Sequence, residues 1–296
     1  MEIFRELVKI DASCVGLGFF DGVHLGHRAL IEKLVNRAKS LNSKSVLLTF
    51  QKSPAENFVK NFRYITSDTE KKTILNELGI DYMVELDFSK LVNYTAEDYI
   101  SKIIYTYFRP KYITSGFNHT FGKNKSGNPE MLRTYQNRYN YIYEEIPPVK
   151  AKEEIISSTL IKELLHSGNI TKANNLLGHS FKIEGIVVEG NKLGRTIGFP
   201  TANILYPDYK TQIPFGVYKT TVKYKGNVFS GLLNYGVKPT INSKNQPVAE
   251  VHIIGFNENI YGNTIEISIL DRIRNEKKFS SLDELKHQIK EDLNVC

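Results

Sequence analysis

The sequence has few cysteines and no long apolar run. Its two cysteines, Cys14 and Cys296, stand at opposite ends of the 296 residues, and no Cys-x-x-Cys pair occurs. A disulfide framework and a structural zinc site are therefore excluded. No apolar stretch approaches the roughly 18–20 residues of a membrane-spanning helix. The first residues carry charge in place of an apolar core, so we expect no secretory signal and a soluble, cytoplasmic protein.

What is present is the composition of an ordinary globular protein. Hydrophobic residues make up 41% and charged residues 24%, which excludes wholesale disorder. Lys and Arg number 39 against 32 Asp and Glu, a net charge of +7 that suits anionic small molecules or nucleic acid without choosing between them. The length predicts two domains. No internal repeat or low-complexity tract is visible.

Strand-like and helical segments alternate over the first 150 residues. Apolar, β-prone runs at 14–19, 45–50, 82–86, 111–115 and 141–146 are separated by helical patterns at 27–40, 69–78 and 96–108. Strands joined by helices of this length form parallel sheets with crossover connections. The pattern therefore predicts a doubly wound α/β domain.

The pattern changes after two short predicted helices, 158–166 and 170–177. Five strand-like runs follow, at 182–188, 216–225, 227–234, 248–256 and 264–270, and a helix at 281–293 ends the chain. Lys225-Gly226-Asn227 is typical of a hairpin turn, and Ser281 with Glu284 predicts a capping box. Strands without crossover helices indicate a small antiparallel barrel or sandwich. We expect domains at 1–178 and 179–296.

The first candidate motif is GFFDGVHLGH, residues 18–27, at a predicted strand-to-helix junction. A helix start offers free N–H groups to phosphate, Gly26 allows close approach, and His24 and His27 can donate hydrogen bonds. The dinucleotide fingerprint is absent, because Asp21 stands where its third glycine should be, and no Walker loop occurs. The alternative is a polar turn with two incidental histidines. A metal site is disfavoured, because no third ligand is near.

The second motif is ISSTLIKELL, residues 156–165. Ser157, Ser158 and Thr159 precede a predicted helix, so the simplest interpretation is an N-cap. A full capping box fails, because Lys162 occupies the third position after Thr159. Hydroxyl groups with a lysine on a first helical turn are equally suited to a triphosphate.

The third motif is GNKLGRTIGFPTAN, residues 190–203. Its glycines, interleaved with Lys192 and Arg195, predict a flexible cationic loop that folds over phosphates. Pro200 then stiffens the chain before Thr201 and Asn203, which share one face of an extended segment and offer oxygen ligands to Mg²⁺ and ATP. A glycine-rich barrel connection is the alternative.

The fourth candidate is Glu250, a lone carboxylate within the apolar run VAEVHII. A carboxylate there can accept a hydroxyl proton during phosphoryl transfer. The alternative is a charge that protects an exposed edge strand from pairing.

Together these motifs resemble the bifunctional prokaryotic riboflavin kinase/FMN adenylyltransferase family, also called FAD synthetase. The resemblance covers nearly the whole chain. It rests on the motifs above and on SGFNHTFGKNKSGN at 115–128, LGHSFKIEGIVVEGNKLGRTIGFPTANI at 177–204, FGVY at 215–218, NYGVKPTI at 234–241 and ILDRIRNEKKFSSLDELKHQI at 269–289. GRTIGFPTAN is specific to riboflavin kinases, whereas H-x-G-H marks a broader nucleotidyltransferase superfamily.

The resemblance implies that the C-terminal barrel phosphorylates riboflavin with ATP, giving FMN and ADP. Glu250 is then the catalytic base, and Thr201 and Asn203 hold Mg²⁺ with ATP. Arg274 closes over the flavin. The implied ATP-binding residues of this domain are Gly190, Lys192, Gly194, Arg195, Gly198, Pro200, Thr201 and Asn203.

The resemblance also implies that the N-terminal domain joins FMN to the adenylyl group of a second ATP, giving FAD and pyrophosphate. His24, His27 and Lys162 are then catalytic. The implied ATP-binding residues are Gly18, Phe19, Asp21, Gly26, Ser157, Ser158 and Thr159. The implied flavin-binding residues are Asn118, Phe121, Lys123 and Lys125.

Three departures from the family pattern lie in the first domain. Lys162 replaces an arginine, Asn118-His119 replaces Asp-Phe, and the run TFQKSPAENF at 49–58 lacks a histidine-proline pair. They keep open a riboflavin kinase whose first domain is slow, regulatory or inactive. Two further alternatives are a basic nucleic-acid-binding module and an H-x-G-H transferase for another metabolite. We expect neither nucleic acid nor membrane as a partner, and an oligomer is possible.

Overall fold

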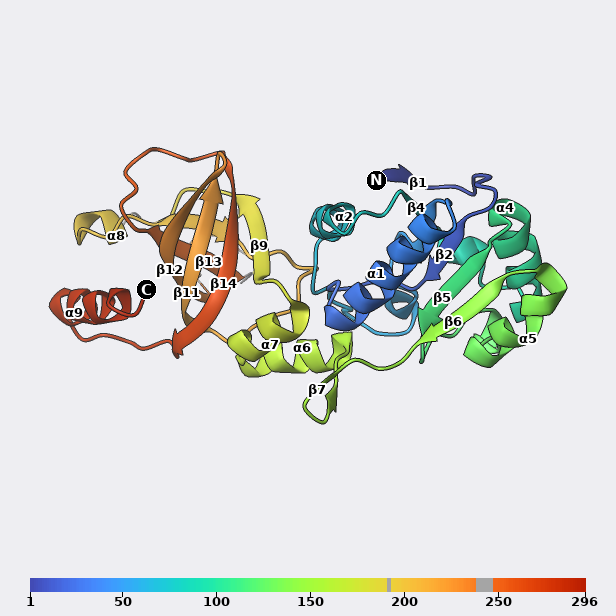
Figure 1. The fold of residues 1–296 in the computed structure, drawn as a ribbon. Coiled ribbons are helices and arrows are strands. Elements are labelled where there is room, and N and C mark those ends of the chain that lie inside the picture. The colour runs from blue at the N-terminus through green and yellow to red at the C-terminus, as the bar shows by residue number, and fades with distance from the viewer. Residues whose placement is uncertain (191–192, 238–246) are drawn as a thin grey trace. The chain divides into compact units, whose positions relative to one another are not determined.

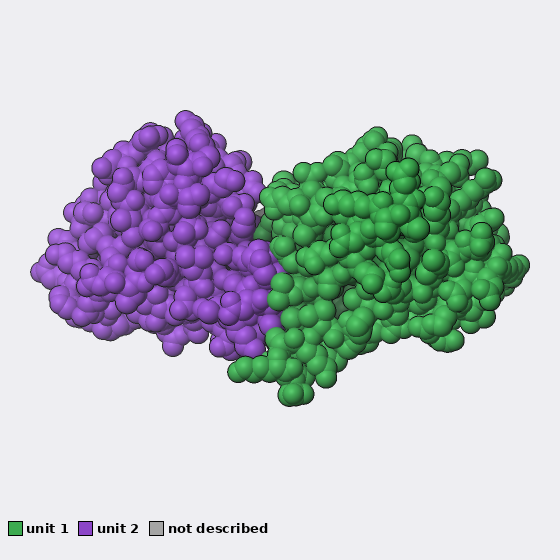
Figure 2. Space-filling view, viewed as in Figure 1, with its two compact units in different colours: residues 1–62, 67–158 green, residues 63–66, 159–296 purple. Residues whose placement is uncertain are grey.

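Figure 1 shows the fold in a computed structural model that describes residues 1–190, 193–237 and 247–296. The chain divides into two compact units, coloured separately in Figure 2: residues 1–62 with 67–158, and residues 63–66 with 159–296. This division places the helices of residues 158–177 almost wholly with the second unit, whereas the sequence patterns put the domain boundary after them. None of the helices among the described residues is long and apolar enough to cross a membrane.

Unit 1 is built on a six-stranded sheet in the order β1-β4-β3-β2-β5-β6, with every pair parallel. The strands are β1 (Glu2–Phe4), β2 (Cys14–Leu17), β3 (Ser45–Phe50), β4 (Tyr82–Leu86), β5 (Tyr112–Gly116) and β6 (Ile142–Ile146). Chain order reverses at β2, between β3 and β5. Ligands of open parallel sheets bind beyond the carboxyl ends of the strands at such a reversal.

Apolar clusters on both faces of this sheet confirm the predicted doubly wound architecture. One cluster joins the sheet to α1 (Leu25–Ser40) and α2 (Asp68–Glu77), and the other joins it to α5 (Pro129–Tyr139) and the helical segment 96–108. The apolar side chains predicted for the first helix are all buried: Leu30, Ile31, Leu34, Val35 and Ala38. Alternate residues of each strand therefore enter opposite cores.

The remaining elements of unit 1 are short or irregular. The predicted helix 96–108 consists of α3 (Ala96–Asp98), a π-helix η3 (Tyr99–Tyr105) and α4 (Thr106–Phe108). The 3₁₀ turns are η1 (Pro54–Asn57), η2 (Phe88–Lys90) and η4 (Lys123–Lys125), and β7 (Lys150–Ala151) pairs with β8 (Glu154–Ile155). Sequence patterns missed β1 and α5.

Unit 2 is a six-stranded antiparallel sheet in the order β10-β13-β12-β11-β14-β9. The strands are β9 (Phe181–Ile186), β10 (Ala202–Leu205), β11 (Gly216–Tyr224), β12 (Asn227–Val237), β13 (Pro247–Ile253) and β14 (Thr264–Arg274). A bridge between Val188 and Asn203 brings the two edges together, so the sheet is a nearly closed barrel, as predicted. The predicted hairpin turn is confirmed, with φ of 47° at Lys225 and 83° at Gly226.

Four helices accompany the barrel in the described part of unit 2: α6 (Ser158–Ser167), α7 (Ile170–Leu177), α8 (Leu193–Thr196) and α9 (Leu282–Leu293). The capping box predicted at α9 is half right. Ser281 accepts a hydrogen bond from the Glu284 N–H at 3.2 Å, but the Glu284 carboxylate accepts from the N–H and hydroxyl of Ser280. Two donors on Ser280 hold the carboxylate away from the Ser281 amide.

Candidate functional sites

The loop between β2 and α1 carries the first site of unit 1. Phe20, Gly22 and Val23 all have positive φ, at 63°, 82° and 38°. A bulky residue pays a steric cost in this region of backbone space, so the turn is held by its surroundings. Asp21 and His24 are both only 5% exposed. The loop thus forms a tight polar cradle at the carboxyl edge of the sheet.

His24 is the N-cap of α1, and its ring is fixed by that role. Its Nδ1 accepts a hydrogen bond from the His27 N–H at 3.3 Å. The His24 and His27 rings stack with centroids 3.7 Å apart. Because Nδ1 accepts, the proton of a neutral His24 lies on Nε2, which is then a donor. Capping and anion binding are therefore compatible in this side chain.

Both histidines are neutral in the empty protein near pH 7. Burial lowers the pKa of His24 from 6.5 to about 4. Burial and the neighbouring His24 lower the pKa of His27 well below its usual value. The site therefore offers a phosphate neutral imidazole donors and a helix N-terminus.

The structure brings the start of the second motif against this loop. The Ser158 hydroxyl donates to the Asp21 carbonyl at 2.9 Å. A Cβ on Gly26 would lie 3.1 Å from the His24 ring and 3.6 Å from the Ile156 carbonyl, so these segments are in close contact. Thr159 and Lys162 belong to the second compact unit.

Lys71 is a buried cation beside the loop that sequence patterns did not single out. It lies in the first turn of α2, is 5% exposed, and its Nζ is 5.0 Å from the centroid of the Phe19 ring. Burial lowers its pKa, and the carboxylates of Glu85, Asp68 and Asp21 oppose that effect. The sequence alone could not reveal this residue, because a lysine in a predicted helix is expected to be exposed to solvent.

In the segment after β5, one of the predicted flavin-binding residues is buried and the other three are exposed. Phe121 belongs to the apolar core, 7% exposed and 5.4 Å from the Tyr99 ring. Asn118, Lys123 and Lys125 are exposed at the carboxyl edge of the sheet. The His119 ring stacks on Phe121, and burial lowers the pKa of His119 to about 4.

Unit 1 also contains a cavity of about 510 Å³ beyond β3 and β4, lined in part by Ser53, Asn57 and Phe88.

In unit 2, the third and fourth motifs converge. Thr201 donates its hydroxyl hydrogen to Oε1 of Glu250 at 2.7 Å. Asn203, Glu250 and Asn234 lie side by side across β10, β13 and β12. β13 is paired on both sides, so the edge-strand explanation of Glu250 is wrong. The barrel register therefore gathers an alcohol, two amides and a carboxylate on one face.

Thr201 and Asn203 fit a magnesium ion chemically. Oδ1 of Asn203 is buried and has no hydrogen-bond partner among the described residues. A Cβ on Gly190 would come within 2.6 Å of the Asn203 amide nitrogen, so glycine keeps the main chain close to that side chain. Thr201 donates its only hydrogen to Glu250, which leaves its lone pairs available. Neutral oxygen ligands of this kind suit Mg²⁺ completed by phosphate oxygens.

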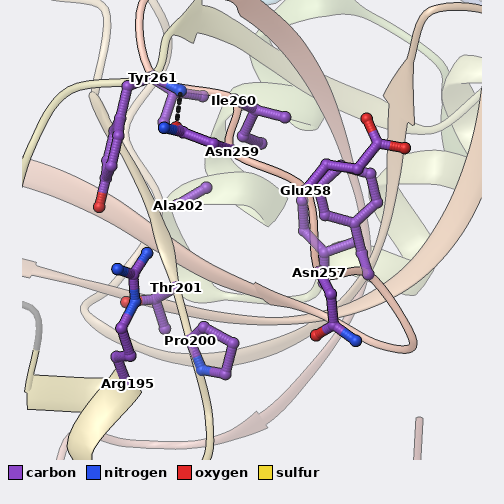
Figure 3. A pocket seen from close by; sticks show the side chains of 12 residues that line it. Arg195, Pro200, Thr201, Ala202, Asn257, Glu258, Asn259, Ile260 and Tyr261 are labelled. Carbon is purple, nitrogen blue, oxygen red and sulfur yellow. Dashed lines mark hydrogen bonds between the residues drawn. The ribbon is translucent and has the colours of Figure 1, made fainter.

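Two cavities meet at Thr201. The first, about 450 Å³, is lined by Arg195, Pro200 and Thr201 and by the segment 256–261. Figure 3 shows Asn259 and Tyr261 across this pocket from Pro200, with Asn259 Oδ1 accepting from the Tyr261 N–H at 3.2 Å. Sequence analysis named Arg195, Pro200 and Thr201 but not the segment 256–261, whose asparagines resemble those of any loop.

The second cavity, about 460 Å³, lies between the barrel and α9. Thr201, Glu250 and His252 line it from the barrel, and Ile289 lines it from α9. Arg274 also lines it and is held by a two-pronged ion pair with the buried Asp292, with N–O distances of 2.7 to 3.0 Å. Arg274 is thus oriented at the wall of this pocket.

Residues 194–199, which precede Pro200 and Thr201, form a tight turn. Phe199 donates its N–H to the Gly194 carbonyl at 2.7 Å, and a Cβ on Gly194 would lie 2.3 Å from the Phe199 carbonyl oxygen. Gly198 has φ of 90°, and within the parts of the chain that the structure describes no atom lies within 4 Å of a Cβ placed there. Lys192, the other predicted cation, lies outside the described residues.

Comparison with known proteins agrees with this two-site arrangement. The sequence model for FAD synthetase matches residues 8–160, and the model for riboflavin kinase matches residues 177–296. The bifunctional riboflavin kinase/FMN adenylyltransferase of Haemophilus influenzae is 37% identical, covering 100% of this chain and 98% of that protein. The Escherichia coli K12 protein of the same name is 35% identical, covering 93% of this chain and 89% of its own.

This chain belongs to the bifunctional riboflavin kinase/FMN adenylyltransferase family. A crystal structure from Streptococcus pneumoniae titled macrolide-efflux protein is also similar, at 32% identity and a TM-score of 0.91 over 100% of this chain and 98% of that one. That title describes the other protein. The riboflavin kinase match covers the barrel with its two cavities, and the FAD synthetase match covers the loop of His24 and His27.

Proposed function

We propose that this chain makes FAD from riboflavin in two steps, phosphorylation in the barrel and adenylylation of FMN in unit 1. The observation that carries the first step is Thr201, which lines both cavities and is hydrogen-bonded to Glu250. A group-transfer site needs a donor pocket and an acceptor pocket that share one wall. The participants are riboflavin, FMN, FAD, ATP, ADP and pyrophosphate, and we place the reactions in the cytoplasm.

In the kinase step, ATP occupies the pocket of Arg195 and Tyr261, and riboflavin occupies the pocket beside α9. The second cavity has apolar walls suited to an aromatic ring system. The 5′-hydroxyl oxygen of riboflavin attacks the γ-phosphorus, its proton passes to Glu250, and the bond to the ADP oxygen breaks. The Thr201 hydroxyl orients the Glu250 carboxylate for this transfer.

Thr201 and Asn203 are the residues that would hold Mg²⁺ with the phosphates. When bound, the ion neutralises charge on the transferring phosphoryl group. Arg195 adds a cation from α8, and Gly190, Gly194 and Gly198 allow the main chain to approach the phosphates closely. Arg274 and its partner Asp292 hold the flavin side of the site.

In the adenylylation step, a phosphate oxygen of FMN attacks the α-phosphorus of ATP, and pyrophosphate leaves. The attacking oxygen is already ionised, so this step needs no base. His24 and His27 donate hydrogen bonds to the phosphate oxygens, and the N–H groups that begin α1 stabilise the added charge. Ser157, Ser158, Thr159 and Lys162 bind the remaining phosphates in our proposal.

The flavin of this second step lies at the carboxyl edge of the parallel sheet. Asn118, Lys123 and Lys125 are exposed there and suit its polar and phosphate groups. Phe121 is buried in the apolar core, so its part in this site is to support the segment that carries them. Gly18, Phe19, Asp21 and Gly26 shape the cradle for ATP.

The decisive experiment separates flavins by chromatography after incubation with ATP and Mg²⁺. We expect Glu250→Gln to lower riboflavin phosphorylation by about 10²-fold or more, the size typical of a lost general base. FAD formation from added FMN should stay near wild type, because Glu250 belongs to the other unit.

Three results would contradict parts of this proposal. A wild-type protein that makes no FMN from riboflavin removes the kinase assignment. FMN without FAD leaves the kinase and points to Lys162, Asn118 and His119 as causes of a lost second step. A Glu250→Gln protein with full kinase activity removes Glu250 as the base.

A further inference from the structure

The wall between the two barrel cavities has a side-chain anchor, His252, to which the sequence motifs assigned no role. His252 Nδ1 lies 2.8 Å from the Pro200 carbonyl oxygen. A carbonyl only accepts, so Nδ1 carries the proton and donates. The His252 ring also meets the Phe199 ring edge-on, with centroids 5.6 Å apart. Both contacts fall on the segment that separates the cavities.

The hydrogen bond from His252 matters more because its acceptor residue is a proline. Proline has no N–H, so its carbonyl is the only main-chain group through which this residue can be hydrogen-bonded. The residue after it is Thr201, whose hydroxyl must reach Glu250. A rotation of the Pro200–Thr201 peptide would therefore move the hydroxyl away from the carboxylate.

His252 and Glu250 are two residues apart on β13, so they share a face of the strand. Strand β13 therefore holds the Pro200–Thr201 dipeptide at two points. Glu250 accepts a hydrogen bond from the Thr201 hydroxyl, and His252 donates one to the Pro200 carbonyl. β13 is hydrogen-bonded to a strand on each side, so it holds both of these side chains on a rigid backbone.

We propose that His252 is a positioning residue of the kinase step, which holds the Pro200 carbonyl so that Thr201 and Glu250 stay aligned. The inference rests on the proposed kinase function of the barrel. It assigns His252 no contact with the reacting atoms. Its effect on rate passes through the placement of Thr201.

The test compares three substitutions in the full chain. His252→Asn places an amide N–H where Nδ1 stood, His252→Gln places it one atom further out, and His252→Leu removes the donor while keeping bulk. We expect His252→Leu and His252→Gln to lower kcat for riboflavin phosphorylation by about 10- to 100-fold, in line with a displacement of about 1 Å at a reacting group. His252→Asn should restore most of that loss.

The loss should fall on kcat, with KM for riboflavin changing less than about threefold, because every other residue that lines the pocket is unchanged. FAD formation from added FMN is measured on each preparation as an internal check that the chain is folded. His287→Leu, at an exposed α9 position, is the matched control and should behave as wild type.

Equal kinase activity in all three variants would overturn the inference, as would an Asn variant as slow as the Leu variant. If His252→Leu does not fold, the Asn and Gln pair decides alone, since both keep a polar amide. A wild-type chain that fails to phosphorylate riboflavin would instead refute the kinase function itself, so the two failures are distinguishable.

Discussion

At the residue scale, burial decides the charge of His24 and His27, the groups that we propose bind phosphate in unit 1. His24 and His27 are held neutral by their surroundings, whereas an exposed histidine would be partly protonated near pH 6.5. Neutral rings can stack at 3.7 Å, and two imidazolium rings there would repel each other. The site therefore contributes oriented donors in place of fixed positive charge.

This has a consequence for stability against pH. The unfolded histidines bind protons below about pH 6.5, and folded His24 does so only near pH 4. Between about pH 4 and pH 6.5 the unfolded state therefore binds more protons than the folded state. The free energy of unfolding is not reduced by these histidines above pH 6.5 and falls as the pH drops towards 4. We expect urea unfolding followed by circular dichroism to show a lower midpoint at pH 5 than at pH 7.5 for the wild type.

The double variant His24→Asn, His27→Asn is the comparison for that measurement. It removes two of the buried histidines with a lowered pKa and leaves His119, so the difference between the pH 5 and pH 7.5 midpoints should shrink without vanishing. An unchanged difference would show that other groups, such as the carboxylates, carry the whole dependence.

At the element scale, the tight loop from Gly194 to Phe199 depends on a missing side chain. Gly194→Ala would put a methyl group 2.3 Å from the Phe199 carbonyl oxygen, so the loop must move. We expect riboflavin phosphorylation to fall by at least about tenfold, because Arg195 lies in the displaced segment and Thr201 follows it by two residues. The rate of FMN formation measures this directly.

Gly226→Ala is the control for that change. Gly226 also has a left-handed backbone, with φ of 83°, but no atom of the described residues lies within 4 Å of an added Cβ. We expect a loss of about 1 kcal/mol in unfolding free energy with little effect on kinase rate. Similar kinase losses in both variants would mean that general destabilisation, not loop placement, explains the Gly194→Ala result.

Sequence patterns predicted elements well where periodicity was strong and poorly where it was weak. The helix of α1 and the hairpin at Lys225 were predicted because apolar spacing and turn chemistry are local signals. β1 was missed because its three residues are largely exposed and show no alternation. α5 was missed because only Leu132 of its eleven residues is buried, so its apolar face is too narrow to read.

The same limit applies to the sites. Thr201, Asn203 and Glu250 were singled out from sequence, and the structure brings them together because β10 and β13 pair in the required register. His252, Lys71 and the segment 256–261 were not, since a histidine in an apolar strand or a lysine in a helix has many ordinary explanations. Only the fold shows which of these face a cavity or a loop.

At the scale of the whole molecule, His27 and Glu250 lie in different compact units. We expect Glu250→Gln to lose FMN formation and His27→Asn to lose FAD formation, each leaving the other reaction intact. Mixing the two variant proteins with riboflavin, ATP and Mg²⁺ should then restore FAD after a lag, because FMN released by one chain is taken up by the other. Chromatography of timed samples follows both flavins.

The outcome of this mixing experiment shows whether FMN is released into solution between the two steps or stays on the chain that made it. FAD formation with a lag that shortens as protein concentration rises indicates free FMN as the intermediate. An absence of FAD, when each variant is active in its own half-reaction, would show that FMN does not leave the chain on which it is made.

The shared wall at Thr201 also has a consequence for inhibitor chemistry. Two pockets of about 450 and 460 Å³ adjoin the same hydroxyl. With ATP and riboflavin bound as we propose, an adenosine fragment and a flavin fragment can be joined by a short linker that passes this hydroxyl. Once one fragment binds, the tether holds the other at a high effective concentration, and weak fragments combine into a strong ligand. Linker length, varied one atom at a time, would then serve as a ruler for the separation of the two substrates.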